Sequence, residues 1–230
     1  MSEFIYFGHR GARGHEPENT LLSFKKALDS GLKWIELDVY AVGNELVVIH
    51  DSRLERTTDG AGRVQSSSLE YLRSLDAGKG EKIPYLREVL DLLAAKAGIN
   101  IELKGVDTAK PVTLLIEKYI SEFGWQPEQF MVSSFNHYEL KKFKKLSPHI
   151  RIGALTSNLP FGYASFAEKL GAFSVNASLE FIDRKFVDDA HRKGMKFYVY
   201  TVNNPDDLKY VKDLGADGVF TDYPELALNG

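Results

Sequence analysis

A glycine stands between an amphipathic segment and a short apolar run at five places in this chain of 230 residues. A glycine just past a helix end supplies the left-handed residue that closes the last helical turn. A strand after each such stop is typical of repeated βα units around a parallel sheet. The junctions are Gly31 before residues 34–38, Gly98 before 99–103, Gly171 before 173–175, Gly194 before 196–200 and Gly215 before 218–220. This repetition restricts the fold more than any other feature and predicts an α/β protein.

Eight apolar runs are candidates for the strands of the sheet. They lie near residues 4–8, 34–39, 99–104, 130–134, 151–155, 173–176, 196–201 and 217–220, with seven helices between them and a short one at 224–229. Eight parallel strands with outer helices form the (β/α)₈ TIM barrel, whose usual length of about 250 residues matches this chain. An open doubly wound sheet is the alternative, but no glycine-rich dinucleotide turn supports it. We therefore expect a single TIM-barrel domain over residues 1–230.

One insertion interrupts the alternation, over residues 41–83, between the second strand and a helix expected at 84–97. Gly43-Asn44 is typical of a hairpin turn, which returns the chain through residues 46–49. Long loops that follow barrel strands lie on the catalytic face. We interpret the insertion as a small cap over a site, and the alternative is a surface excursion without function.

The second and third expected strands carry carboxylates at positions where apolar residues would suffice. Glu36 and Asp38 share one face of their strand because side chains alternate with period two. On the next strand, Glu102 shares a face with Asn100 and Lys104. Buried carboxylates need cations or a metal. Internal ion pairs of Glu102 with Lys104 or Arg10 are one interpretation, but three carboxylates at adjacent strand ends favour a metal site. Oxygen ligands alone point to one divalent cation, Mg²⁺ or Ca²⁺.

Two of the six histidines are placed for chemistry. His9 follows the first strand and His50 ends the return strand of the hairpin, so the expected topology delivers both to the rim with the carboxylates. Imidazole transfers protons near neutral pH. Arg10 beside His9 adds a planar donor fork suited to phosphate. The remaining histidines are interpreted as structural: His15, His137, His149 and His191.

Composition removes several classes of function. Without cysteine the chain has no disulfide, no thiolate nucleophile and no zinc site with sulfur ligands. A net charge of −3 argues against nucleic acid as the main partner. The start of the chain leaves no room for a secretory leader, and no apolar run approaches the ~20 residues that span a bilayer. We expect a cytoplasmic protein without a stable membrane anchor, and the oligomeric state stays open.

Seven motifs in one order carry a resemblance to a known family. They are His9-Arg10-Gly11, Pro17-Glu18-Asn19-Thr20, Glu36-Leu37-Asp38-Val39, His50-Asp51, Ile101-Glu102-Leu103-Lys104, Thr201-Val202-Asn203 and Gly218-Val219-Phe220-Thr221-Asp222-Tyr223-Pro224. In this order the set resembles the glycerophosphodiester phosphodiesterases over nearly the whole chain. Tyr200 departs from the family, which often has tryptophan before Thr-Val-Asn, so the pocket wall is expected to differ in shape.

The resemblance implies a barrel enzyme that hydrolyses glycerophosphodiesters to sn-glycerol 3-phosphate and an alcohol, with residues 41–83 as the family's small cap. It also implies the site residues: Glu36, Asp38 and Glu102 for the divalent ion, His9 and His50 as the acid/base pair, and Arg10 and Lys104 for the phosphate. We assign His9 as base and His50 as acid. Water and the glycerol 2-hydroxyl both remain candidate nucleophiles.

Three other functions compete with this interpretation. A related barrel phosphodiesterase of phospholipase C- or D-like type would act on intact phospholipid, but it needs an apolar rim and the insertion is mostly polar. A non-catalytic binding module would be expected to lack one of the histidines or carboxylates. A sugar-phosphate isomerase on the same fold would have little use for three clustered carboxylates.

Overall fold

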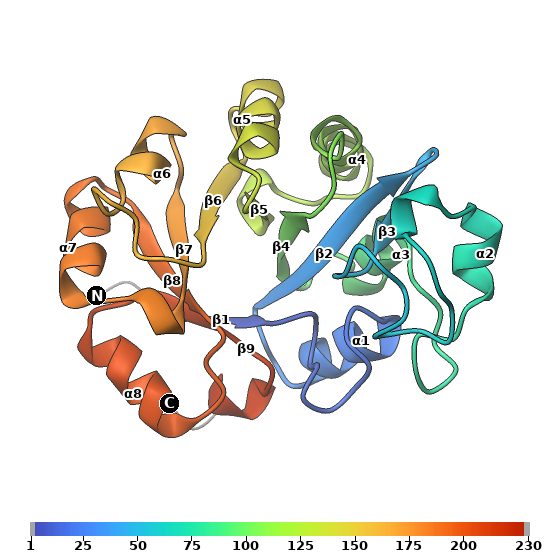
Figure 1. Cartoon of the computed structure of the whole chain (residues 1–230), viewed down its shortest axis with the longest axis horizontal. Coiled ribbons are helices and arrows are strands. Elements are labelled where there is room, and N and C mark those ends of the chain that lie inside the picture. The colour runs from blue at the N-terminus through green and yellow to red at the C-terminus, as the bar shows by residue number, and fades with distance from the viewer. Residues whose placement is uncertain (1–2, 228–230) are drawn as a thin grey trace.

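The computed structural model describes residues 3–227 and forms a closed barrel of eight parallel strands (Figure 1). Each barrel strand pairs in parallel with the next, and β1 pairs with both β2 and β9, which closes the ring. The strands are β1 (Ile5–Gly8), β2 (Trp34–Val42), β4 (Gly98–Leu103), β5 (Phe130–Ser134), β6 (Arg151–Thr156), β7 (Ser174–Ser178), β8 (Lys196–Tyr200) and β9 (Gly218–Thr221). The TIM barrel is confirmed, and the open sheet is excluded.

Helices cover the outside of the barrel. They are α1 (Leu21–Asp29), α3 (Leu86–Leu93), α4 (Ala109–Glu122), α5 (His137–Leu146), α6 (Ser165–Lys169), α7 (Arg184–Arg192) and α8 (Pro205–Asp213). Capping side chains mark where helices begin: Thr20 accepts from Ser23 N, and Asn204 accepts from Asp207 N with Pro205 in the first turn. The helix expected at 224–229 is a 3₁₀ turn over Pro224–Ala227, and residues 228–229 lie outside the described residues.

Four of the five glycine stops are confirmed: Gly31, Gly171, Gly194 and Gly215 have φ of 84°, 63°, 75° and 87°. The prediction for Gly98 is wrong. Helix α3 ends at Leu93, and Ala94 and Ala95 take the left-handed conformation there. Gly98 instead begins β4, where an added Cβ would lie 2.8 Å from the Trp34 ring. This glycine allows close side-chain approach inside the barrel and does not end a helix.

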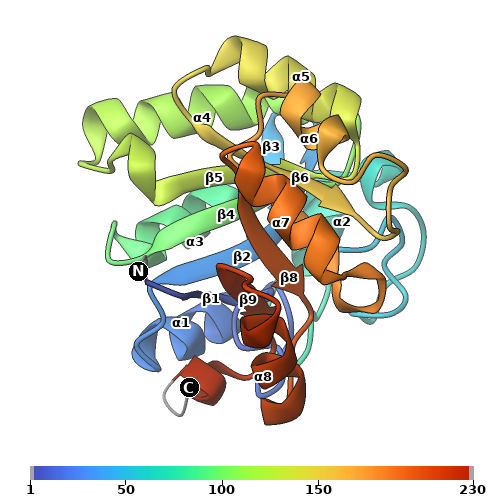
Figure 2. The same ribbon diagram turned by 90° about the vertical axis from the view of Figure 1, so that its left-hand side faces the viewer.

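The segment after β2 forms a hairpin and a small packed unit. Strand β2 runs on to Val42 and pairs antiparallel with β3 (Glu45–Val48), so the turn at residues 43–44 is confirmed. A 3₁₀ turn, η1 (Val64–Ser66), and helix α2 (Leu69–Ser74) follow. Leu54, Val64 and Leu72 are fully buried in a cluster of their own. In Figure 2 this teal segment lies on the right, the side toward which the arrows of β6 and β8 point.

Candidate active site

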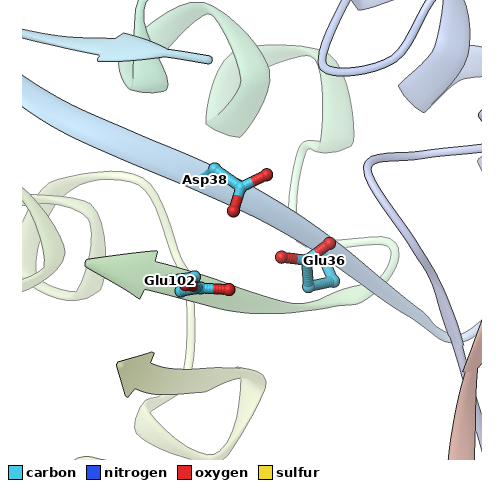
Figure 3. Close-up of side chains that lie close together, drawn as sticks. All are labelled: Glu36, Asp38 and Glu102. Atoms are coloured by element: carbon cyan, nitrogen blue, oxygen red, sulfur yellow. The ribbon is translucent and has the colours of Figure 1, made fainter. Parts of the chain in front are cut away.

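Three carboxylates meet at the carboxyl end of the barrel. Glu36 and Asp38 lie on β2 and Glu102 lies on β4, where Asp38 is the register partner of Glu102. One oxygen of each lies within 4.8 Å of the other two, and all three residues are buried. Figure 3 shows their carboxylates gathered on the same side of the two strands. The period-two alternation of adjacent strands therefore builds the cluster that the sequence predicted.

Two cations flank the carboxylates. Lys104 Nζ lies 2.8 Å from Glu102 Oε1 and 3.6 Å from Asp38 Oδ1, and Arg10 Nε lies 3.4 Å from Asp38 Oδ2. The backbone N–H of Arg10 donates to Glu36 Oε2 at 2.8 Å. Asp38 Oδ1 still has no hydrogen-bond partner among the described residues, although it is buried. The internal ion pairs exist, but they leave one buried carboxylate oxygen free to accept another ligand.

Burial and mutual repulsion disturb the titration of this cluster. Burial and the charges of Asp38 and Glu102 raise the pKa of Glu36 well above its ordinary value. Burial and the charge of Asp38 raise the pKa of Glu102 to about 7. Burial also acts to raise the pKa of Asp38, but the charges of Lys104, Arg10 and His50 outweigh it and lower that pKa. Without a further cation, burial and mutual repulsion therefore oppose full ionisation of the cluster, and a divalent ion would favour it.

His9 is held by a carboxylate from the last strand of the barrel. Its Nδ1 lies 2.7 Å from Asp222 Oδ1. Asn203 fixes that carboxylate: its Nδ2 donates to Asp222 Oδ2 at 2.8 Å, and its Oδ1 accepts from Asp222 N at 2.9 Å. Burial lowers the pKa of His9, and the hydrogen bond to Asp222 opposes this shift. The imidazole is therefore fixed in orientation, with no partner for Nε2 among residues 3–227.

His50 has a carboxylate partner in a different setting. Its Nδ1 lies 2.5 Å from Asp51 Oδ1, and Asp51 accepts two hydrogen bonds from Arg56, at 2.6 and 2.9 Å. Arg56 also donates two bonds to Glu18, at 2.8 Å each, and Glu18 accepts from Arg10 at 2.7 Å. Burial lowers the pKa of His50. Arg56 belongs to the segment after β2, so that segment contributes a positioning contact to the site.

A pocket of about 250 Å³ connects these groups. Its polar wall holds His9, Arg10, Arg13, Glu36, His50 and Glu102, and its apolar wall holds Phe135, Leu155, Tyr200 and Phe220. The Tyr200 hydroxyl donates to Thr156 O at 2.8 Å, and its ring lies edge-on to Phe135 with 5.9 Å between centroids. The tyrosine that departs from the family pattern therefore forms part of the wall.

The structure brings all seven expected site residues to one end of the barrel. None of the other histidines lines this pocket: His15 and His149 pair with exposed carboxylates, His191 pairs with the part-buried Asp217, and His137 bonds Leu155 O. Sequence reasoning gave no role to Asp222 and Asn203, although both stand in quoted motifs just after β9 and β8. Polar residues at the carboxyl ends of barrel strands face the site, and this rule, which predicted Asp38, could also have predicted Asp222 and Asn203. Arg56 lies in an irregular loop and had no such signal.

The model of the glycerophosphoryl diester phosphodiesterase family matches residues 9–226. The chain belongs to this family. A glycerophosphodiester phosphodiesterase of Caldanaerobacter subterraneus is 36% identical, over 98% of this chain and 96% of that protein. One of Bacillus altitudinis is 34% identical, over 96% of each chain.

Solved structures agree with the family match. An Oleispira antarctica phosphodiesterase in complex with the product sn-glycerol-3-phosphate has a TM-score of 0.89 and 31% identity, over 98% of this chain and 95% of that one. Glycerophosphodiester phosphodiesterase from Thermotoga maritima has a TM-score of 0.80 and 26% identity, over 100% and 99%. Membership confirms the resemblance and the expected enzyme class, the phosphoric diester hydrolases. Among the described residues, no helix combines the length and apolar character needed to cross a membrane.

Proposed function

We propose that this protein hydrolyses glycerophosphodiesters to sn-glycerol 3-phosphate and an alcohol, with a divalent cation and two histidines. One observation carries the proposal: two members of a buried carboxylate cluster, Glu36 and Glu102, line one pocket at the carboxyl end of the barrel together with two carboxylate-paired histidines. Active sites of TIM barrels lie at this end. The product named in the Oleispira antarctica complex supports the choice of substrate.

Glu36, Asp38 and Glu102 would hold the cation. When all three are ionised, their three negative charges exceed the two positive charges of Arg10 and Lys104 by one. A divalent ion reverses this to one positive charge, which matches the single negative charge of a phosphodiester. The unpartnered Asp38 Oδ1 and the all-oxygen donor set fit Mg²⁺ or Ca²⁺. When bound, the ion would supply charge stabilisation at the phosphoryl group.

Arg10 and Lys104 would bind the phosphate oxygens. The Arg10 side chain is tied to Glu18 and Asp38, so its fork is fixed in direction, and Lys104, just after β4, is tied to Glu102 and Asp38. Donors that are fixed before the reaction stabilise charge in the transition state without reorganising. Both cations therefore neutralise the negative charge that otherwise repels a nucleophile.

The partners of the two histidines support His9 as base and His50 as acid. Asp222 is bound by neutral Asn203 and forms one ion pair with Arg13 at 3.4 Å, so more of its charge remains to stabilise a protonated His9 than at Asp51. Asp51 is neutralised by two bonds from Arg56. Its stabilisation of a protonated His50 is weaker, and this histidine would give up its proton more readily to the leaving alkoxide. Asp222 and Asp51 are positioning residues in this scheme.

One observation favours a second candidate, the phospholipase C- or D-like activity on phospholipid. The loops after β5, β6 and β7 expose three phenylalanines: Phe161 is fully exposed, and Phe135 and Phe181 are 43% and 40% exposed. A lipid-directed enzyme needs apolar residues at its rim, and these three lie outside the polar insertion. We keep the small-molecule glycerophosphodiester as the proposed substrate, in a cytoplasmic protein that binds no nucleic acid.

The test is release of sn-glycerol 3-phosphate from glycerophosphocholine, measured with a glycerol 3-phosphate dehydrogenase assay. We expect activity with Mg²⁺ or Ca²⁺, none with chelator, and much slower release of choline or phosphocholine from phosphatidylcholine micelles, measured with a separate assay because this lipid yields no sn-glycerol 3-phosphate. Full activity of metal-free protein would contradict the metal proposal. Faster turnover of the micellar phospholipid would replace the first candidate with the second.

A further inference from the structure

A second cavity lies at the opposite end of the barrel. Its volume is about 480 Å³, compared with about 250 Å³ for the catalytic pocket. The lining residues include the first residues of several strands: Ile5, Trp34, Arg151 and Lys196 begin β1, β2, β6 and β8. The amino end of a TIM barrel usually serves stability. A cavity of this size there calls for an explanation from its side chains.

The Tyr6 hydroxyl and the Lys33 ammonium at this cavity have no acceptor among the described residues, and the same holds for three further donors: the Trp34 indole N–H, the Tyr198 hydroxyl and the Arg151 guanidinium. Trp34 and Tyr198 pack on the same ring, with centroids 5.6 and 5.0 Å from that of Phe7. Tyr198 is only 1% exposed. The charge of Arg151 acts on the Tyr198 hydroxyl, whose pKa is raised by burial and by Asp217. The three donors are therefore neighbours around one space.

Neither acid in the cavity wall, Glu3 or Asp217, satisfies these donors among the described residues. Asp217 accepts from Lys196 Nζ at 2.7 Å, His191 Nε2 at 2.8 Å and Phe197 N at 2.9 Å. Arg151 instead stacks on the ring of Phe173, 4.6 Å from its centroid. Lining side chains carry three positive charges (Lys33, Arg151, Lys196) and two negative (Glu3, Asp217), an excess of one positive charge. The cavity is thus complementary to a single negative charge.

The walls define the rest of the ligand. Trp34, Phe173 and Met131 supply flat apolar surface beside the donors. Gly98 makes room for the indole, because a Cβ there would lie 2.8 Å from the ring. An arginine fork binds a carboxylate through two hydrogen bonds, while apolar walls hold the body of a small ligand. We propose that the amino-end cavity is a binding site for a small monocarboxylate with a flat apolar body, separate from the catalytic pocket.

The chain carries its own reporter for this site. It has two tryptophans, Trp34 in the cavity and Trp125, which is 1% exposed and packs on Phe130. In a Trp125→Phe variant, tryptophan fluorescence reports Trp34 alone. Titration with 4-phenylbutyrate should change this fluorescence and saturate, with a dissociation constant at or below about 1 mM. The neutral 4-phenylbutanamide should bind at least ~10-fold more weakly, because it lacks the charge that Arg151 recognises.

Two variants that each lose one positive charge, Arg151→Met and Lys104→Met, show at which end of the barrel the ligand binds. Arg151→Met should weaken 4-phenylbutyrate at least ~10-fold, whereas Lys104→Met, in the catalytic pocket, should leave its affinity within about twofold. Tyr198→Phe removes only a hydroxyl and should weaken binding by a factor of ~3–10, so it serves if Arg151→Met does not fold. Calorimetry on the unmodified chain replaces fluorescence if Trp125→Phe does not fold.

Three outcomes would overturn the site. They are no saturable binding of 4-phenylbutyrate up to about 10 mM, equal affinity for the amide, and unchanged affinity in both Arg151→Met and Tyr198→Phe. Loss of binding in Lys104→Met alone would assign the ligand to the catalytic pocket and reject the proposal.

Discussion

The carboxyl end of the barrel and its amino end differ in how their polar groups are partnered. At the carboxyl end the innermost groups are three carboxylates and two cations, an excess of negative charge. At the amino end donors outnumber acceptors, and the lining carries an excess of positive charge. One strand supplies both ends: Glu36 and Asp38 of β2 face the first, and Trp34 faces the second. Sites for a cation and for an anion can therefore arise from one alternating strand pattern.

The largest effect should come from breaking the carboxyl end at Glu36. Glu36→Gln keeps an oxygen for the Arg10 N–H but removes one charge from the proposed metal site, so kcat/KM should fall ~10³-fold. In metal-free protein the same change should raise Tm, because the pKa of Glu36 is raised in the folded state and its ionisation opposes folding. Thermal unfolding with chelator should therefore show more stabilisation at about pH 8 than at about pH 5.

Glu88→Gln is a matched control, since Glu88 lies far along the chain in α3 and pairs with Arg73. It should leave kcat/KM within about twofold. Wild-type activity of Glu36→Gln at limiting Mg²⁺ would remove Glu36 from the metal site.

The histidines should give the next largest effects. His9→Ala and His50→Ala should each lower kcat by ~10²-fold, the lower end of the range for a general acid or base, with the fold retained. A substrate whose leaving alcohol has a low pKa needs little acid assistance, so it should rescue only His50→Ala if His50 is the acid. If this substrate rescued His9→Ala instead, His9 would be the acid and His50 the base.

A substrate analogue should separate the glycerol side from the alcohol side. If groups at the carboxyl end bind the glycerol 2-hydroxyl, the 2-deoxy diester should lose at least ~10²-fold in kcat/KM, because buried polar groups are left unpaired. Glycerophosphocholine and glycerophosphoethanolamine should differ by less than about tenfold. A cyclic phosphate detected during turnover would identify the 2-hydroxyl as nucleophile. Equal kcat/KM for the 2-deoxy diester and its parent would require a different substrate.

Substitution of the positioning carboxylates Asp222 and Asp51 should lower kcat less than loss of a histidine, and the two effects should differ in size. Asp222→Asn removes the charge that opposes the lowered pKa of His9, so that pKa should fall further. The acidic limb of the pH profile of kcat/KM should then move to lower pH, and kcat should fall at least ~10-fold. Asp51→Asn should have a smaller effect, since Arg56 already neutralises Asp51. An unchanged pH profile in Asp222→Asn would leave Asp222 with a structural role only.

The sequence predicted the barrel from local rules, and the seven candidate site residues that it proposed lie at one end of that barrel, although their roles remain proposals. Glycine stops and period-two alternation depend on neighbours along the chain, and they delivered Glu36, Asp38 and Glu102 to one rim. The network from His50 through Asp51, Arg56 and Glu18 depends on how a loop folds back over the barrel, which no periodicity encodes. The sequence did not predict the amino-end cavity, because the lack of acceptors for its donors can be recognised only in the folded structure.

The smallest effect on catalysis should come from the amino end, at Gly98. Gly98→Ala forces a Cβ to within 2.8 Å of the Trp34 ring, and fixed ring packing on Phe7 prevents an easy shift. We expect a loss of ~1–3 kcal/mol in the free energy of unfolding, typical of overpacking, with kcat within about twofold because the chemistry lies at the other end.

Gly31→Ala is the matched control for the backbone. Gly31 has φ of 84° and no atom within 4 Å of an added Cβ, so its substitution strains only the left-handed conformation, by ~1 kcal/mol. Denaturant unfolding of both variants, with fluorescence of Trp34 in Trp125→Phe as a second probe, separates the two mechanisms. Gly98→Ala should alter the native Trp34 emission, and Gly31→Ala should leave it nearly unchanged. If Gly98→Ala instead kept its stability but lost activity, the two ends of the barrel would be coupled, and their treatment as separate sites would be wrong.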